Sequence, residues 1–487
     1  MVGVPRSSGC QLCRKRRVKC DEVKPACGNC LRYGAACPGY EKQLKFVSGK
    51  HVVRPKGSGA KLSPSSQRGG GSSSSSSSSN GSPSSSSLMS FSSPAQSITR
   101  SPSPNRAQFV ATMLASATVT LQQKDVTGFF SWMQLGSIGM TAGLDSALCC
   151  LSMHIVGKNV GDAAMVASSR TLYGQSLAEL QRQLVHRTKW RDSDTLCMAI
   201  LLCIFELFAG TGSSDSWLQH ARGIGVLIEQ RGPAAHADGW DAAMLLSIRG
   251  ILIMSDLFYP RDEACFLSRK EWHHVMKDRG RRLIHPPTIS DESIEAVDEY
   301  NVQLAYVPEV VRLGYPALLA ARSGMPPDPV YIAAARPIAV RCHAHMKAWN
   351  EKYKHVFPPV EEVPSEDPDS LYATVIKYPV GWAGTMQISY WATMVLLQGM
   401  LGVLQHEHNY EQEQQEYVRG ILRSVEHLGQ GPLGAYRVGY AVRVAYEVAS
   451  ADAQAWIRRQ LDRLSKTYAA VDKATYPEQR ADDEGYS

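Results

Sequence analysis

The stretch CQLCRKRRVKCDEVKPACGNCLRYGAAC, residues 10–37, contains six cysteines in two similar halves. Their spacing is C-x2-C-x6-C-x6-C-x2-C-x6-C, so an interval of two residues followed by one of six occurs in each half. The six are Cys10, Cys13, Cys20, Cys27, Cys30 and Cys37. Thiolates are soft ligands, and Zn²⁺ takes four of them in a tetrahedron. The stretch is therefore a candidate zinc site.

Six thiolates cannot supply two separate zinc ions, because two tetrahedra need eight ligands. Two ions can both have four ligands if two of the sulfurs are shared. The repeat suits this solution, since each half can give one bridging and two terminal thiolates. By symmetry we expect Cys10 and Cys27, the first cysteine of each half, to be the bridges. The expected cofactor is a pair of Zn²⁺ ions.

Three other arrangements of these cysteines are alternatives. They are the disulfide framework of a small secreted module, a single four-cysteine zinc site with two spare thiols, and an iron–sulfur cluster. A secreted module would follow a signal peptide, and the preceding residues MVGVPRSSG have no apolar core. The loop between Cys13 and Cys20 is also packed with charge. We therefore expect zinc.

Five cations occupy the six positions between the second and third cysteines. They are Arg14, Lys15, Arg16, Arg17 and Lys19. These side chains would repel one another in a free helix, but a short helix tied to metal at both ends can hold them on one compact knob. Arginine suits the O6 and N7 edge of guanine, and lysine suits phosphate or guanine. The simpler interpretation is a nuclear import signal or a solvated face.

This stretch resembles the Zn₂Cys₆ binuclear cluster of fungal transcription factors. The matching residues are GC-x2-CR-x-RR-x-KCDE, then KPAC-x2-C, and Pro-Gly-Tyr after the last cysteine. The resemblance implies the same two bridging cysteines, and a short helix whose C-terminal end reads a CGG-like triplet in the major groove. On matching positions Arg17 is the implied base reader, with Arg16 beside it. Arg14 and Lys19 are implied contacts to the DNA backbone.

Charge is distributed unevenly along the chain. Residues 1–70 hold 15 Lys and Arg against 3 Asp and Glu, a net of +12, whereas the whole chain carries +7, which leaves −5 for the remainder. A basic head on a mildly acidic body is typical of a nucleic-acid binder with a separate regulatory domain. We expect a flexible N-terminus at residues 1–9 and a Zn₂Cys₆ DNA-binding domain at residues 10–40.

Residues 41–105 are rich in Ser, Gly and Pro and include eight consecutive serines at 72–79. Such a tract cannot bury a core, so we expect a disordered linker. It has no a/d heptads, so a coiled-coil dimer is not predicted. Monomeric DNA binding and a homodimer through the large domain are both open.

Helical periodicity dominates residues 106–475 and predicts an all-α regulatory domain, followed by a flexible tail at 476–487. No apolar run reaches the roughly 18 residues of a membrane helix, so we expect no membrane partner. The six remaining cysteines are expected to be buried thiols. The predicted helices are 108–121, 144–156, 163–185, 192–208, 216–230, 242–258, 294–313, 331–353, 385–406, 411–427, 436–448 and 452–468.

The segment WLQHARGIGVLIEQRGP, residues 217–233, resembles the W-x2-H-x2-G…LI-x2-RGP signature of the fungal-specific transcription factor domain. The preceding Phe-Glu-Leu-Phe, which contains Glu206, is similar to the same family. In some relatives that domain binds a small apolar ligand or contacts coactivators. By spacing, Trp217 and His220 share a helix face and predict core packing, with the histidine bonded to backbone. We assign Glu206 and Arg231 to the same core; the carboxylate needs a partner there.

These features predict a nuclear, zinc-dependent, sequence-specific regulator of transcription by RNA polymerase II. Its expected partners are double-stranded DNA, a coactivator or corepressor, and a small apolar ligand of the helical domain. Two alternatives belong to other classes: a zinc–thiolate redox or metal-sensing protein, and an enzyme-like helical body with an appended zinc module. The sequence has no Walker loop, G-x-S-x-G or H-E-x-x-H motif, so we expect no catalysis.

Overall fold

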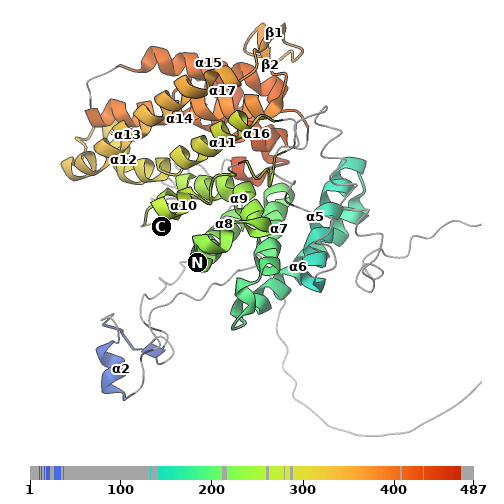
Figure 1. Ribbon diagram of the computed structural model, residues 1–487. Coiled ribbons are helices and arrows are strands. Elements are labelled where there is room, and N and C mark those ends of the chain that lie inside the picture. The colour runs from blue at the N-terminus through green and yellow to red at the C-terminus, as the bar shows by residue number, and fades with distance from the viewer. Residues whose placement is uncertain are drawn as a thin grey trace, which may run out of the picture. The chain divides into compact units, whose positions relative to one another are not determined.

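The structure, a computed structural model, describes part of the chain. The described residues are 10, 12–13, 16, 18–21, 27–34, 37, 132 and 141–472, the last range without 211–215, 259–262, 279, 286–288, 406–408 and 432. The chain divides into two compact units, residues 1–47 and 48–487. The first unit contains the six cysteines and a short helix, α2 (Gly28–Arg32), and the second is a helical body (Figure 1).

Helices form nearly all of the regular structure described in the body, as the sequence predicted. Those in its first half are α5 (Ala142–Val160), α6 (Ala163–Val185), α7 (Ser193–Ala209), α8 (Ser216–Arg231), α9 (Gly239–Phe258) and α10 (Lys270–His273). Those in its second half are α11 (Asp291–Leu304), α12 (Val307–Arg322), α13 (Pro329–Tyr353), α14 (Gly381–Gln405), α15 (Glu411–Leu428), α16 (Gly434–Tyr446) and α17 (Ala451–Ser465). The predicted helix 108–121 and the predicted linker lie outside the described residues.

Short 3₁₀ turns join several of these helices. They are η2 (Lys189–Arg191), η3 (Pro233–His236), η4 (Phe266–Ser268), η5 (Lys354–Val356) and η6 (Ala469–Val471). The turn η3 begins at the proline that the sequence analysis placed at the end of its signature segment. Proline cannot continue a helix, and Gly232 before it takes a positive φ of 78°, so α8 ends here.

The junction between α5 and α6 illustrates how the sequence sets helix ends. The Thr141 side chain accepts a hydrogen bond from the Leu144 backbone N–H (3.3 Å) and caps α5. Gly161 then takes a left-handed conformation, φ 73°, which glycine adopts at little cost. Asp162 caps α6 by accepting from the Met165 N–H (2.9 Å). The predicted start of the second helix at residue 163 is confirmed.

One predicted helix, 294–313, is two helices in the structure. Helix α11 ends at Leu304 and α12 begins at Val307, with Pro308 in its first turn. Proline has no N–H to donate but fits the first turn, where that donor would have no partner within the helix. The apolar periodicity runs through the junction and therefore did not reveal it.

A two-stranded hairpin departs from the all-α prediction. Strands β1 (Glu361–Pro364) and β2 (Thr374–Lys377) pair antiparallel, with Val363 opposite Val375, and β2 packs on α15. Four residues are too few to give a clear alternating pattern, so the sequence analysis did not find these strands.

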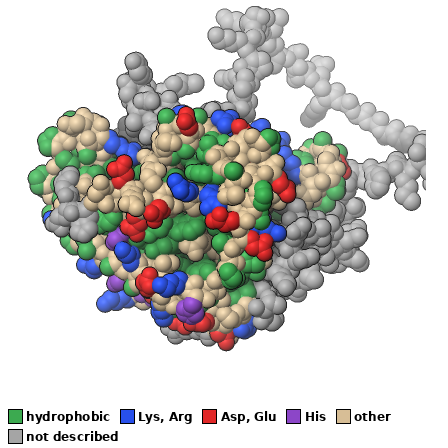
Figure 2. Space-filling view, turned by 90° about the horizontal axis from the view of Figure 1, so that it is seen from above, with side chains coloured by type: hydrophobic (Ala, Val, Ile, Leu, Met, Phe, Trp, Pro, Cys, Tyr) green, Lys and Arg blue, Asp and Glu red, His purple; other side chains and the backbone are tan. Residues whose placement is uncertain are grey.

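Neighbours in sequence are generally neighbours in space in the body. Figure 1 shows α5 and α6 at one side, α7 to α9 in the middle and α12 to α16 beyond them, and the packing pairs α5–α7, α7–α8, α8–α9 and α9–α12 link these groups. Helix α7 is buried along its length from Thr195 to Leu207, because it is apolar on every face. The outer face in Figure 2 instead carries charged side chains of both signs with hydrophobic side chains between them.

Helix α14 is long and apolar enough to cross a membrane. No other helix among the described residues has this length and composition. However, 61% of its most apolar window is buried inside the body, where it packs against α12, α13, α15 and α16. A core helix of a folded domain has the same length and composition. We therefore interpret α14 as a core helix.

Candidate metal centre and nucleic-acid interface

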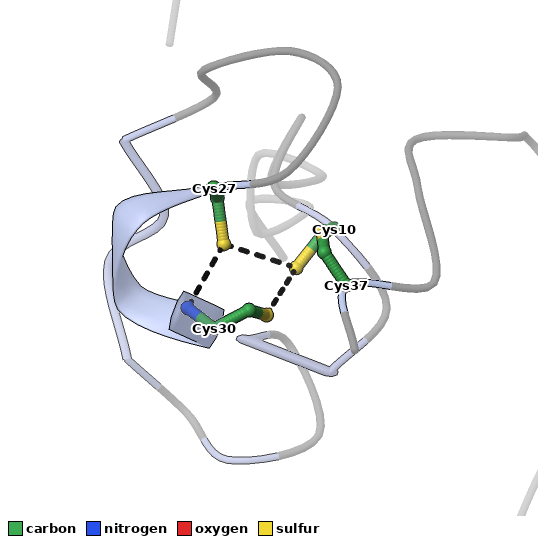
Figure 3. A group of neighbouring side chains, drawn as sticks. All are labelled: Cys10, Cys27, Cys30 and Cys37. Carbon is green, nitrogen blue, oxygen red and sulfur yellow. Dashed lines mark hydrogen bonds between the residues drawn. The ribbon is translucent and has the colours of Figure 1, made fainter. Parts of the chain in front are cut away.

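The six cysteine sulfurs gather at the centre of the N-terminal unit. Cys10, Cys13, Cys27 and Cys30 are fully buried, and Cys20 and Cys37 are half-buried. None of them forms a disulfide. The Cys10 sulfur lies 3.7 Å from that of Cys27 and 3.6 Å from that of Cys30, as drawn in Figure 3. The sulfurs of Cys13 and Cys27 are also 3.6 Å apart.

These distances fit shared metal ligands better than disulfides. A disulfide would bring two sulfurs to about 2.05 Å. In a zinc tetrahedron with Zn–S bonds of about 2.3 Å, two sulfurs are about 3.8 Å apart. The donor atoms form two groups, each with all atoms within 4.8 Å of one another: Cys10, Cys13, Cys20 and Cys27 in one, and Cys10, Cys27, Cys30 and Cys37 in the other. Cys10 and Cys27 occur in both groups, which is the arrangement that bridging sulfurs require.

Each of the two shared sulfurs also sits in the same local geometry. The Cys13 backbone N–H donates to the Cys10 sulfur (3.4 Å), and the Cys30 N–H donates to the Cys27 sulfur (3.3 Å). In the second half Cys27 is the N-cap of α2. Hydrogen bonds from N–H groups stabilise a thiolate, so both positions suit a charged sulfur.

Burial works against that charge when no cation is present. It raises the pKa of the Cys13 thiol to about 12, with hydrogen bonds from neighbouring thiols adding to the effect, and raises the pKa of Cys30 as well. Metal must therefore displace protons when it binds, and the affinity for zinc rises with pH.

Polar side chains outside the cysteines join the two halves. Asp21 accepts a hydrogen bond from the Gly28 backbone N–H (3.1 Å), and the Asn29 side chain donates to the Lys19 carbonyl (2.5 Å). A Cβ atom at Gly28 would lie 2.6 Å from Asp21 Oδ2, so glycine leaves room for this contact. The end of the cation run is thus fixed to the start of α2.

Of the five predicted DNA-contacting cations, Arg16 and Lys19 are among the described residues, and Arg14, Lys15 and Arg17 lie outside them. The Arg16 guanidinium lies 3.4 Å from the centre of the Tyr33 ring. Such stacking holds the guanidinium plane in one orientation. The sequence analysis did not single out Tyr33; its signal was an aromatic residue three positions after the fifth cysteine.

In the body, the signature residues lie in the core. Glu206 and Trp217 are 4% and 2% exposed, and His220 is 5% exposed. The His220 ring nitrogen Nε2 pairs with the Tyr173 hydroxyl at 3.1 Å, a partner that the sequence analysis did not identify. Tyr173 stacks on Phe205 of α7, with ring centres 4.7 Å apart. Helices α6, α7 and α8 therefore meet at this cluster.

Arg231 has a clear structural role at the end of α8. Its Nη2 lies 2.8 Å from Asp241 Oδ1, and the Ser193 hydroxyl donates to the other oxygen of that carboxylate at 2.6 Å. Asp241 therefore connects the last residue of α8 to the starts of α7 and α9.

Comparison with known proteins agrees with both parts of this description. Residues 8–45 match the fungal Zn(2)-Cys(6) binuclear cluster domain, and residues 89–257 match the fungal specific transcription factor domain. The chain thus carries the two domains of fungal Zn(2)-Cys(6) transcription factors. The match to that domain and the clustering of the six cysteines imply that this unit binds zinc.

The relatives are fungal proteins. The chain is 31% identical over 272 residues to an uncharacterized protein of Emericella nidulans. The aligned residues cover 55% of this chain and 55% of that protein. It is 54% identical over 39 residues to White-opaque regulator 2 of Candida albicans, covering 8% of this chain and 9% of that protein. It is 32% identical over 111 residues to Sterol uptake control protein 2 of the same species, covering 22% and 13%. The chain thus spans about half or less of these relatives, and no solved structure matches it.

The contact between Asp21 and Gly28 can be tested by a double-mutant cycle. Asp21→Ala removes this hydrogen bond, and Gly28→Ala places a Cβ against the Asp21 carboxylate and should displace it. Each variant should therefore weaken zinc binding by a few-fold to about tenfold. The double variant should lose no more than either single variant. Competition with a chromophoric chelator measures the affinity, and Leu31→Ala, at an exposed position of α2, is the control. Additive losses would show that the two residues act separately.

Burial of His220 predicts an acid-sensitive body. The pKa of His220 is lowered by burial from 6.5 to about 4. Between these values the unfolded chain binds a proton that the folded chain does not, so the free energy of unfolding falls as the pH drops from 6.5 to 4. His220→Gln should make this dependence shallower by up to about 1.4 kcal/mol per pH unit.

Urea unfolding followed by tryptophan fluorescence at several pH values measures this dependence. The control is His186→Gln, because His186 is exposed at the end of α6. Identical pH dependence in the parent and in His220→Gln would mean that His220 does not resist protonation in the folded state.

Proposed function

We propose that this protein is a nuclear, zinc-dependent regulator of transcription by RNA polymerase II that binds CGG-like sites in double-stranded DNA. The observation that carries the proposal is the pair of four-sulfur groups that share Cys10 and Cys27, directly beside a run of five cations. The two matched domains support it, since a DNA-binding cluster followed by a regulatory domain is the organisation of a transcription factor.

The proposed cofactor is two Zn²⁺ ions, with Cys10 and Cys27 as bridges and the other four cysteines as terminal ligands. Zinc would supply folding energy and no catalysis, because every ligand position is filled by protein sulfur. Two zinc ions and six thiolates carry a formal charge of −2, which offsets part of the repulsion among the neighbouring cations.

In the proposed complex Arg17 reads a base edge in the major groove, with Arg16 beside it. Arg14, Lys15 and Lys19 contact phosphates and set the register of the module. The stacking of Arg16 on Tyr33 supports this division, because a guanidinium held by its face keeps its N–H edge available for a bidentate contact. The helical body is proposed to contact a coactivator or corepressor.

The DNA contacts predict different effects for different cations. Arg17→Ala should weaken binding to a CGG-bearing duplex by about 1–3 kcal/mol and relax preference at one base, with little effect on random DNA. Lys19→Ala should weaken both duplexes alike and lower the salt dependence of binding by about one unit of slope. Fluorescence anisotropy across a salt series measures both.

The matched control is Arg187→Ala, at an exposed cation of the body, which should leave DNA binding unchanged. Binding that survives a zinc chelator would contradict the proposed function. Equal losses on CGG-bearing and random DNA would mean that Arg17 contacts phosphate only.

The zinc count can be measured by native mass spectrometry of the full chain, and two ions per chain are expected. Cys37→Ser removes a terminal ligand and should weaken one ion, whereas Cys10→Ser removes a proposed bridge and should weaken both. One ion per parent chain, or equal loss in the two variants, would argue against shared sulfurs.

A further inference from the structure

An aromatic side chain from the second half of the N-terminal unit contacts the cation run of the first half. The centre of the Tyr33 ring lies 3.4 Å from the guanidinium carbon of Arg16. At this distance a planar cation is held over a ring by electrostatic attraction and by stacking. Tyr33 is 58% exposed, so its ring adds little to the buried core of the unit. The ring therefore contacts a predicted DNA-binding residue without being needed to fill the core.

The backbone on each side of this contact is fixed close to a cysteine. The Arg16 N–H donates to the carbonyl of Leu12 (3.0 Å), the residue next to Cys13. The Tyr33 N–H donates to the carbonyl of Cys30 (3.1 Å), and Tyr33 is the C-cap of α2. Cys13 belongs to one group of sulfurs and Cys30 to the other. The stacking of Arg16 on Tyr33 thus joins the two groups through side chains.

The N–H edge of the Arg16 guanidinium is not used by the contact with Tyr33. Stacking engages the face of the guanidinium, and no hydrogen bond or ion pair of this group is found among the described residues. An arginine reads guanine through two N–H groups that lie in one plane, so the plane has to match the base. A side chain loses rotamer freedom when it binds, and a stacked arginine has lost part of that freedom already. Tyr33 therefore prepares Arg16 for a bidentate contact before DNA binds.

We propose that Tyr33 is a positioning residue for DNA recognition, which fixes the plane in which Arg16 reads one base of the site. The five predicted DNA-contacting cations all precede Cys20, so this contact gives the second half of the unit a part in base selection. The inference rests on the proposed DNA-binding function and adds to it a residue that the sequence analysis did not single out.

The test uses the full chain loaded with zinc and three kinds of duplex: a CGG-bearing duplex, its single-base variants and a random duplex. Arg16→Ala should abolish the preference at one base of the triplet. Tyr33→Leu keeps an apolar side chain but removes the ring, and it should lower the preference at the same base by about threefold to tenfold. Affinity for the random duplex should not change, because phosphate contacts carry no base information. Fluorescence anisotropy measures each affinity.

Two further variants separate the ring from the fold of the unit. Tyr33→Phe keeps the face of the ring and should bind every duplex as the parent does. The double variant of Arg16→Ala with Tyr33→Leu should lose no more than Arg16→Ala alone, since both changes act through one guanidinium. The control is Leu31→Ala, at an exposed residue of α2, which should leave base preference unchanged. Native mass spectrometry should find the same zinc content in all variants.

The inference is overturned if Tyr33→Leu keeps the preference of the parent at every base. Tighter binding of Tyr33→Leu to the CGG-bearing duplex would also overturn it, because Tyr33 would then hold Arg16 away from DNA. Three other results have the same consequence: equal weakening on both duplexes would assign Tyr33 to phosphate contact, loss of zinc to the fold, and failure of Tyr33→Phe to its hydroxyl. A parent that binds CGG-bearing and random DNA alike would instead contradict the proposed function, and this inference with it.

Discussion

The sharing of two sulfurs between two groups of thiolates is the constraint on which the N-terminal unit depends. Its buried core consists of four cysteines, and among the described residues the partly buried side chains that pack on them are Leu12, Cys20 and Cys37. A module with so little apolar burial cannot offset the conformational entropy of folding by itself. Metal ligation has to replace the core, and sulfurs common to both groups make the two halves fold as one unit.

The same constraint explains why a dense run of cations can be held in a small space. The run begins after Cys13 and ends at Cys20, and both cysteines belong to one sulfur group. The bond from Asn29 to the Lys19 carbonyl and the stacking of Arg16 on Tyr33 add contacts from the second half. Each contact uses the backbone or the face of a side chain, so N–H edges remain available for DNA.

Local sequence patterns predicted most of this structure. The errors concern features that depend on contacts between residues far apart in the sequence, or on segments too short to give a pattern. Cysteine spacing indicated the sulfur groups, and glycine and proline at residues 232 and 233 indicated the end of α8. The His220 partner could not be predicted, because Tyr173 is 47 residues away on another helix. The short hairpin and the break before α12 were missed because apolar periodicity carries no information on four-residue strands or on a proline in a first turn. Helices α8, α9, α11, α14 and α16 line one cavity in the body, so no single stretch of sequence marks it.

The two units are separate in their cores, yet acid weakens both through different groups. In the first unit, burial holds the Cys13 pKa at about 12, so metal competes with protons for sulfur, and a lower pH favours release. In the body, burial lowers the pKa of His154, His220 and His236 to about 4, so each favours the unfolded chain below pH 6.5. The cause is the same in both units, because burial disfavours whichever form is charged: the thiolate in one case, the imidazolium in the other. Bound zinc would offset the cost of burying charge at the sulfurs. The histidines have no such cation, and burial in the packed core keeps them neutral.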